Sequence, residues 1–244
     1  MVNLLYAEVL KLKRSMIALI SIAGIASGPF LCFVESIIKE AKRPDIPVEG
    51  ATFFSETHLY VFLLIGVLLF SVVTAYLFNR EYTEHTLKNI LTIPVSRIQF
   101  ILSKLILLCL WTMALTLFAW LITVLFALLG QFDGLSMQLF LDAFKQFMMS
   151  GFALFLLSTP MILVTLLFKN YVVTIVFAIA ITMLNLLTYG SEYSALLPWT
   201  AVRVIATGTF FPEYPPIYSY ISIIMTFCVG LIASILYFKN TDVN

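Results

Sequence analysis

The chain has 244 residues, of which 61% are hydrophobic and 11% are charged, and its formal net charge is +1. Its mean hydropathy is +1.04, whereas soluble domains carry about a quarter charged residues. These values exclude an ordinary soluble domain and predict an integral membrane protein.

Residues 2–14 predict an interfacial helix. Leu5 and Leu12 fall on one face of this helix, whereas Lys11 and Arg14 fall on the opposite face. A helix of this kind lies along the lipid headgroups, with its basic residues toward anionic lipid. We therefore expect membrane lipid to be a partner of this segment.

Six apolar segments follow, and they predict one transmembrane domain over residues 1–244. The expected spans are residues 15–38, 58–78, 97–130, 144–168, 171–188 and 217–238. The third would be about 50 Å long, more than a bilayer core of about 30 Å, so it must tilt or project. Pro160 is expected to break the fourth. The predicted fold class is an all-α integral membrane protein.

Residues 190–216 separate the fifth span from the sixth. They are too often interrupted by proline and glycine to span the membrane, and too apolar to form a free loop. The segment therefore predicts a pair of short re-entrant helices on the outer side. Trp199 and Phe210 are expected to lie at headgroup level in an aromatic belt.

Charge is unequal on the two sides of this arrangement. The side with both termini, residues 79–104 and Lys169 carries nine basic and four acidic residues, whereas the other side carries five basic and nine acidic residues. Basic residues concentrate in cytoplasmic segments of membrane proteins. We therefore expect both termini to be cytoplasmic.

Residues 78–104, which include the loop 79–96, form the densest polar segment between two apolar runs. Glu84 and Lys88 have i,i+4 spacing with the acid first, which favours a short helix. Pro94 ends that helix, and Ser96 to Gln99 resembles a capping box that starts the next one. This arrangement predicts a docking loop and not a catalytic site.

No catalytic, cofactor-binding or metal-binding residues are predicted. The sequence contains no HExxH, CxxC, GxSxG or P-loop motif. His58 and His85 are expected on opposite sides of the membrane, and Ser191 is near no histidine that could activate it. A membrane enzyme acting on lipid or peptide stays an alternative, with Asp142 and Lys145 as its acid/base pair. A membrane scaffold that works without an ATPase is another.

The segment after Asn79, REYTEHTLKNILTIPVSRIQFILSKL, resembles the first cytoplasmic loop of ABC transporter type-2 permeases. The resemblance is carried by Glu81, Thr86-Leu87, Pro94-Val95-Ser96-Arg97 and Lys104. The order of an interfacial helix, six spans and re-entrant outer helices is also similar. His85 departs from the glycine of many relatives, which could alter the angle of the loop helix.

The resemblance implies that residues 79–96 are a coupling helix that inserts into a separate ATP-binding subunit. The residues expected to contact that subunit are Glu81, Glu84, Thr86, Lys88 and Arg97. ATP and Mg²⁺ would then bind the partner, and this chain would be a non-catalytic subunit. The complex would hold two ATPases and a second permease; an identical chain is favoured, and a different one stays open.

Among such permeases the chain most resembles those of bacitracin and lantibiotic resistance or immunity. The resemblance therefore implies a bacterial cell-membrane subunit that removes or exports an antimicrobial peptide or another amphipathic compound. No nucleic-acid partner is expected.

Overall fold

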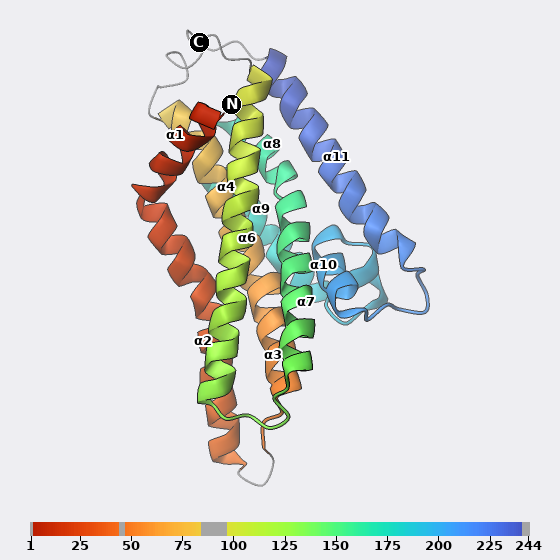
Figure 1. Ribbon diagram of the computed structural model, residues 1–244. Helices are drawn as coiled ribbons and strands as arrows, with labels where there is room; N and C mark the ends of the chain where they lie inside the picture. Colours follow the sequence, from red (N-terminus) through yellow and green to blue (C-terminus); the bar gives the residue numbers. More distant parts are fainter. Residues whose placement is uncertain (1, 44–46, 84–96, 241–244) are drawn as a thin grey trace.

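The computed structural model describes residues 2–43, 47–83 and 97–240, and in these ranges every regular element is helical (Figure 1). The first half contains α1 (Val2–Lys13), α2 (Met16–Lys42), α3 (Gly50–Leu59), the π-helical η1 (Tyr60–Ile65) and α4 (Gly66–Thr83). The second half contains α6 (Arg97–Leu129), α7 (Met137–Leu156), α8 (Thr159–Phe168), α9 (Tyr171–Thr188), the 3₁₀ turn η2 (Glu192–Ala195), α10 (Pro198–Thr207) and α11 (Ile217–Asn240).

Six helical stretches are long and apolar enough to cross a membrane, which confirms the predicted all-helical membrane fold. They are Met16–Lys42, Gly50–Glu81, Ile98–Leu129, Met137–Phe168, Tyr171–Thr188 and Ile217–Asn240. Large apolar side chains such as Leu187 and Met16 cover the outside of these helices, 81% and 75% exposed. Exposed apolar surface on this scale is expected where lipid is the solvent.

The start of α1 and the end of α11 lie at the same end of the helix bundle, which we call the terminal end (Figure 1). The α2–α3 and α6–α7 connections lie at the opposite end. These two connections hold each other, because the amide of Gly50 donates to the carbonyl of Asp133 at 2.7 Å and the amide of Asp133 donates to Val48 at 3.1 Å. These backbone hydrogen bonds hold residues 48–50 against Asp133.

The helix of the second span begins at Gly50, well before the predicted start at residue 58. The reason is packing: Phe53 and Phe54 are buried with Cys32 and Phe132 in an aromatic cluster at this end of the bundle. Burying two phenyl rings contributes roughly 1.5–3 kcal/mol each. The helix is therefore extended by tertiary contacts.

The fourth span is interrupted where the sequence predicted a break. Helix α7 ends at Leu156, and α8 begins at Thr159 with Pro160 in its first turn. Proline is tolerated there because the amides of a first turn have no partner within the helix. Gly230 of α11 packs directly against the backbone of Pro160 at this break.

Between α9 and α11 the structure forms one short α-helix where the sequence predicted a pair. The first of the pair is only the four-residue 3₁₀ turn η2, and α10 follows it. Helix α10 ends at Thr207, and Gly208 follows it with a φ of +69°, which suits glycine. Thr200 and Val204, one turn apart, bury one face of α10 in the bundle, and Val202 on the other side of the helix is buried as well.

Candidate functional site

Four charged side chains meet at the terminal end of the bundle. Glu8 and Lys11 come from α1, Glu81 from the last turn of α4, and Lys104 from the second turn of α6. We call these four residues the charge cluster. It holds two acidic and two basic groups, so its formal charge is balanced, as burial of ions requires.

Lys104 is the centre of the charge cluster. Its side chain is 1% exposed. Its Nζ atom lies 2.9 Å from Oε2 of Glu8, 3.1 Å from Oε1 of Glu81 and 2.8 Å from the carbonyl oxygen of Leu77. An ammonium group has three donors, and each has one of these acceptors. The full set of partners is what makes a buried lysine tolerable inside an apolar helix.

Lys11 lies on the solvent side of the charge cluster, where its side chain is 30% exposed. Its Nζ lies 2.8 Å from Glu81 and 3.1 Å from Glu8. Partial burial lowers the pKa of Lys11, but the hydrogen bonds and negative charges of Glu81 and Glu8 outweigh this and raise the pKa above its ordinary 10.5. Arg80 of α4 also binds the backbone of α1, because its Nη1 donates a hydrogen bond to the carbonyl of Lys11 at 3.2 Å. Helix α1 is therefore fastened to α4 and α6.

The charge cluster lies at the base of the predicted coupling loop. Residues 84–96, with Glu84, Thr86 and Lys88, fall outside the described part of the chain, and so does the side chain of Arg97, the first residue of α6. Glu81 is described, and it is fully buried against Lys104 and Lys11. The structure thus brings one of the five predicted contact residues into a buried ion network.

Sequence analysis did not identify the charge cluster as a unit. It assigned Lys11 to the polar face of an interfacial helix and used Lys104 only as part of the loop resemblance. One signal was available: Lys104 is a cation in a helix whose next 25 residues, to Leu129, contain no charge. An ionisable residue in such a helix demands a buried partner.

A second polar group lies toward the opposite end of the bundle, around His58. This side chain is 0% exposed. Its Nε2 is 2.8 Å from Oγ of Ser150 on α7, and its Nδ1 is 3.1 Å from Nη1 of Arg203 on α10. Arg203 also donates to the carbonyl and hydroxyl oxygens of Ser55. Because burial disfavours the charged form, the pKa of Arg203 is lowered from its usual value.

The contact between His58 and Ser150 was not foreseen, because the sequence analysis considered only Ser191 as a partner for a histidine. Its geometry is nevertheless unsuited to a nucleophile. A guanidinium can only donate, so Nδ1 of His58 must accept, and the remaining proton sits on Nε2. Nε2 then donates to Ser150, whereas a general base would have to accept the proton of the serine. The group is a hydrogen-bond chain between α3, α7 and α10 that is buried at His58 and Ser150 and exposed where Arg203 meets Ser55.

The other predicted acid/base pair is a surface contact. Nζ of Lys145 lies 3.6 Å from Asp142, and the two side chains are 72% and 52% exposed. Exposed pairs of this kind contribute little. Within residues 2–43, 47–83 and 97–240, no three His, Cys, Asp or Glu side chains gather in a way that could hold a metal ion.

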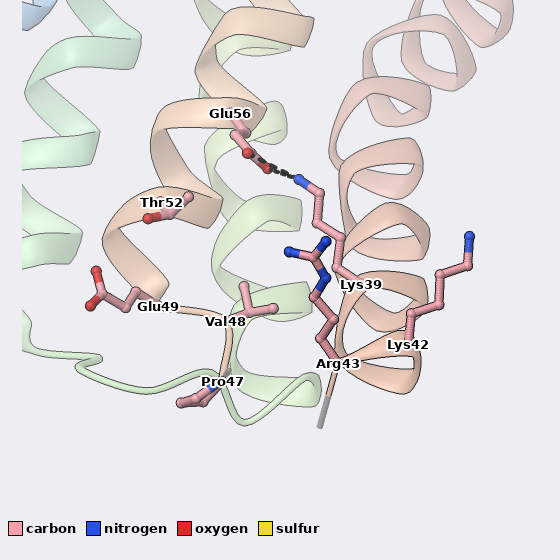
Figure 2. A pocket seen from close by; sticks show the side chains of 8 residues that line it. All are labelled: Lys39, Lys42, Arg43, Pro47, Val48, Glu49, Thr52 and Glu56. Carbon is pink, nitrogen blue, oxygen red and sulfur yellow. Dashed lines mark hydrogen bonds and ion pairs between the residues drawn. The ribbon is translucent and has the colours of Figure 1, made fainter. Parts of the chain in front are cut away.

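A pocket of about 470 Å³ opens at the α2–α3 end of the bundle (Figure 2). Lys39 reaches across it to Glu56 at 3.1 Å, and it also pairs with Glu35 at 3.0 Å. The remaining lining residues are Lys42, Arg43, Pro47, Val48, Glu49 and Thr52. This wall carries both signs of charge and no arrangement that could perform chemistry.

Six apolar helical stretches joined at one end by a buried ion network define a multi-pass helical membrane protein. A model of the ABC-2 family transporter proteins matches residues 4–185. The chain belongs to this family. It is also 60% identical over 206 residues to the "Bacitracin transport permease protein BCRB" of Bacillus licheniformis, a match that covers 84% of this chain and 99% of that protein.

Proposed function

We propose that this permease is the membrane subunit of an ATP-driven exporter that removes bacitracin or a similar amphipathic peptide from the bacterial cell membrane. The proposal for the cargo rests on the 60% identity to a bacitracin transport permease over nearly its whole length. ATP and Mg²⁺ would bind a separate ATPase, because this sequence has no P-loop motif.

The charge cluster is the observation that carries the mechanism. Residues 84–96 connect α4 to α6, and Glu81 and Lys104 join these two helices directly on either side of that segment. We assign ATPase contact to Glu84, Thr86, Lys88 and Arg97, and we assign to the buried Glu81 the role of holding the loop base. A force applied to the loop would then move α1, α4 and α6 as one unit, because breaking a buried ion pair costs several kcal/mol.

The orientation in this proposal follows the charges. The terminal end with residues 79–104 carries the basic excess, which supports a cytoplasmic location. Helix α1 would lie among the cytoplasmic headgroups, with the exposed Lys13 and Arg14 toward them. The turn η2 and helix α10 would form the outer re-entrant element. Two copies of this chain with two ATPases would complete a symmetric transporter.

The test is resistance of a bacitracin-sensitive bacterium that expresses this chain together with its ATPase. Replacing residues 84–88 by a Gly/Ser segment of equal length should abolish both resistance and co-purification of the ATPase. The same replacement of residues 44–46, in the α2–α3 connection, is the control and should leave both intact. Full resistance without the native loop would overturn the proposal.

A further inference from the structure

A second pocket, of about 270 Å³, lies beside α10, between the end of α9, the turn η2 and the residues that follow α10. Its polar lining residues are Tyr189, Ser194, Thr200, Arg203 and Thr209. Among the described residues that line it, none is acidic. The charge cluster is not part of this wall, so the proposed export function leaves the pocket unexplained.

Arg203 is a cation without a counter-ion. Its side chain is half-buried, and within the described residues it forms no ion pair with a carboxylate. By contrast, Lys11, Lys39 and Lys104 each contact two carboxylates. Removing a charge from water is costly unless an opposite charge balances it. The guanidinium of Arg203 therefore calls for an anion.

The charged end of Arg203, and not only its aliphatic part, lies at the pocket wall. Tyr189 is a lining residue, and the Cζ atom of Arg203 lies 5.8 Å from the centre of its ring. The phenol of Tyr189 interacts with the guanidinium, but a phenol is neutral at physiological pH and cannot balance the charge. Because Tyr189 is 47% exposed, its ring can turn aside when an anion enters.

Two donors of the guanidinium remain for that anion, out of the five that an arginine carries. Nη1 donates to the carbonyl of Ser55 at 3.0 Å and to Nδ1 of His58 at 3.1 Å, and Nη2 donates to the hydroxyl of Ser55 at 3.1 Å. The N–H of Nε and the second N–H of Nη2 are left, and they point side by side from one edge of the planar group. That edge fits two oxygens of one phosphate or carboxylate.

The hydroxyl groups of the wall already use their protons within the fold. Ser194 donates to a backbone carbonyl at 2.6 Å, and Thr200 donates to the carbonyl of Ser194 at 2.9 Å. Thr207 donates to the carbonyl of Arg203 at 2.9 Å, so Thr209 is the donor in its 2.8 Å contact with the hydroxyl of Thr207. Arg203 is therefore the residue of this wall that selects the ligand.

The size and the surroundings of the pocket favour a lipid phosphate. A volume of about 270 Å³ is below the range of about 300–1,000 Å³ that is usual for drug-sized ligands, so the pocket holds a headgroup and not an amphipathic peptide. Tyr189 and Tyr193 at its edge are 47% and 54% exposed. Exposed tyrosines are typical of the headgroup level of a bilayer, where phosphate is the abundant anion.

We infer that Arg203 binds the phosphate of a membrane phospholipid in this pocket, through its Nε and Nη2 atoms. Ser55 and His58 hold the other edge of the guanidinium in place. The phosphate balances the charge of Arg203 and accepts its two remaining hydrogen bonds. The bound lipid thereby attaches α10 to the membrane surface.

Phosphatidylglycerol and galactosyl diacylglycerol with identical acyl chains are matched probes, because only the first carries a phosphate. Binding of each lipid to the delipidated full chain in detergent is measured by native mass spectrometry. We expect the wild type to bind phosphatidylglycerol about tenfold more tightly, the effect of hydrogen bonds between charged groups. Equal binding of the two lipids by the wild type overturns the inference without any variant.

Arg203→Gln should remove this preference. Its control is Arg43→Gln, which removes an exposed arginine from the pocket of Figure 2 and should leave the preference unchanged. A preference that survives Arg203→Gln contradicts the inference, because the phosphate is then bound elsewhere.

Thr209→Trp tests the same pocket with Arg203 intact, since Arg203 also holds α10 to α3. The indole fills the pocket from an exposed position and should abolish the preference. Thr52→Trp, at an exposed position of the pocket in Figure 2, is the matched control and should not change it. Undiminished binding of phosphatidylglycerol by Thr209→Trp would place the lipid outside the pocket and overturn the inference.

Two further measurements separate the possible sources of the anion. Inorganic phosphate at millimolar concentration should not displace the lipid, because it has no acyl chain; displacement would assign the pocket to a soluble anion and overturn the inference. A photoreactive amino acid at position 209 identifies the occupant in native membranes: a cross-link to phospholipid supports the inference, and a cross-link to a peptide overturns it. None of these measurements needs an ATPase, so their outcome is independent of the proposed export function.

Discussion

Nζ of Lys104 lies 3.1 Å from Oε1 of Glu81, and each side chain is 1% exposed. These two residues are 23 positions apart in sequence, and the predicted coupling loop lies between them. The contact makes the base of the loop one of the few places in the bundle where charge is buried. Substitutions that break the contact between Glu81 and Lys104 should therefore change the stability of the fold, which tests the structure directly.

Replacing Lys104 by methionine should destabilise the fold strongly. The change keeps an unbranched side chain of nearly the same length but removes the cation that both Glu8 and Glu81 bind, and removing one partner of a buried pair costs about 3–5 kcal/mol. Thermal unfolding in detergent measures the loss. The double variant Lys104→Met/Glu81→Gln should regain part of the lost unfolding temperature, because it no longer buries the excess carboxylate. The control Lys145→Met, at an exposed site, should unfold like the wild type; equal losses at both lysines would contradict the burial of Lys104.

Lys11 should stabilise the fold in a pH-dependent way. Its pKa in the folded protein is raised above 10.5. The stabilisation is therefore fully present below about pH 10.5 and is lost as the pH rises through the higher folded-state value. The wild type should unfold at a higher temperature than Lys11→Gln by a constant amount up to about pH 10, and this difference should shrink toward zero at higher pH. Lys13→Gln, at an exposed position of α1, should show no such closure. A constant gap for Lys11→Gln at alkaline pH would show that its carboxylate partners are wrongly assigned.

Ser150→Ala distinguishes a structural hydrogen bond from a nucleophile. Since Nε2 of His58 already carries a proton and donates a hydrogen bond to Ser150, it cannot take the proton of the serine, and peptide resistance should be retained. Stability should fall by about 1 kcal/mol, which is typical for loss of one buried hydrogen bond. Ser27→Ala, whose hydroxyl bonds only within its own helix at 2.6 Å, is the matched control for stability. Loss of resistance in a folded Ser150→Ala protein would restore the membrane-enzyme alternative.

Gly230→Ala should be more destabilising than Gly24→Ala. A Cβ atom at Gly230 would lie 2.6 Å from the backbone nitrogen of Pro160, which cannot move without separating α8 from α11. A Cβ atom at Gly24 would lie 2.9 Å from the Cδ1 end of Leu69, a flexible side chain that can rotate away. Overpacking of this kind costs about 1–3 kcal/mol. Thermal unfolding of the two variants gives the order; the reverse order would place the α8–α11 contact in doubt.

The sequence alone determined the class of fold and the position of the loop. Six apolar runs require six membrane-spanning helices, because a bilayer accepts only segments whose backbone is satisfied internally. Pro160 required a break in the fourth span, and the polar residues between Asn79 and Ser96 could not lie in lipid. These conclusions depend on neighbours in sequence, and so do the i,i+4 and capping patterns of the loop.

Only the tertiary structure decided which polar groups meet. Glu8 reaches Lys104 across 96 residues and His58 reaches Ser150 across 92. It also decided that Glu81 is covered and that Arg203 reaches His58. Hydropathy places a side chain at a depth in the membrane, but the partner at that depth depends on the rotation and neighbours of each helix. Those are set by the packing of the whole bundle, and no local pattern in the sequence encodes them.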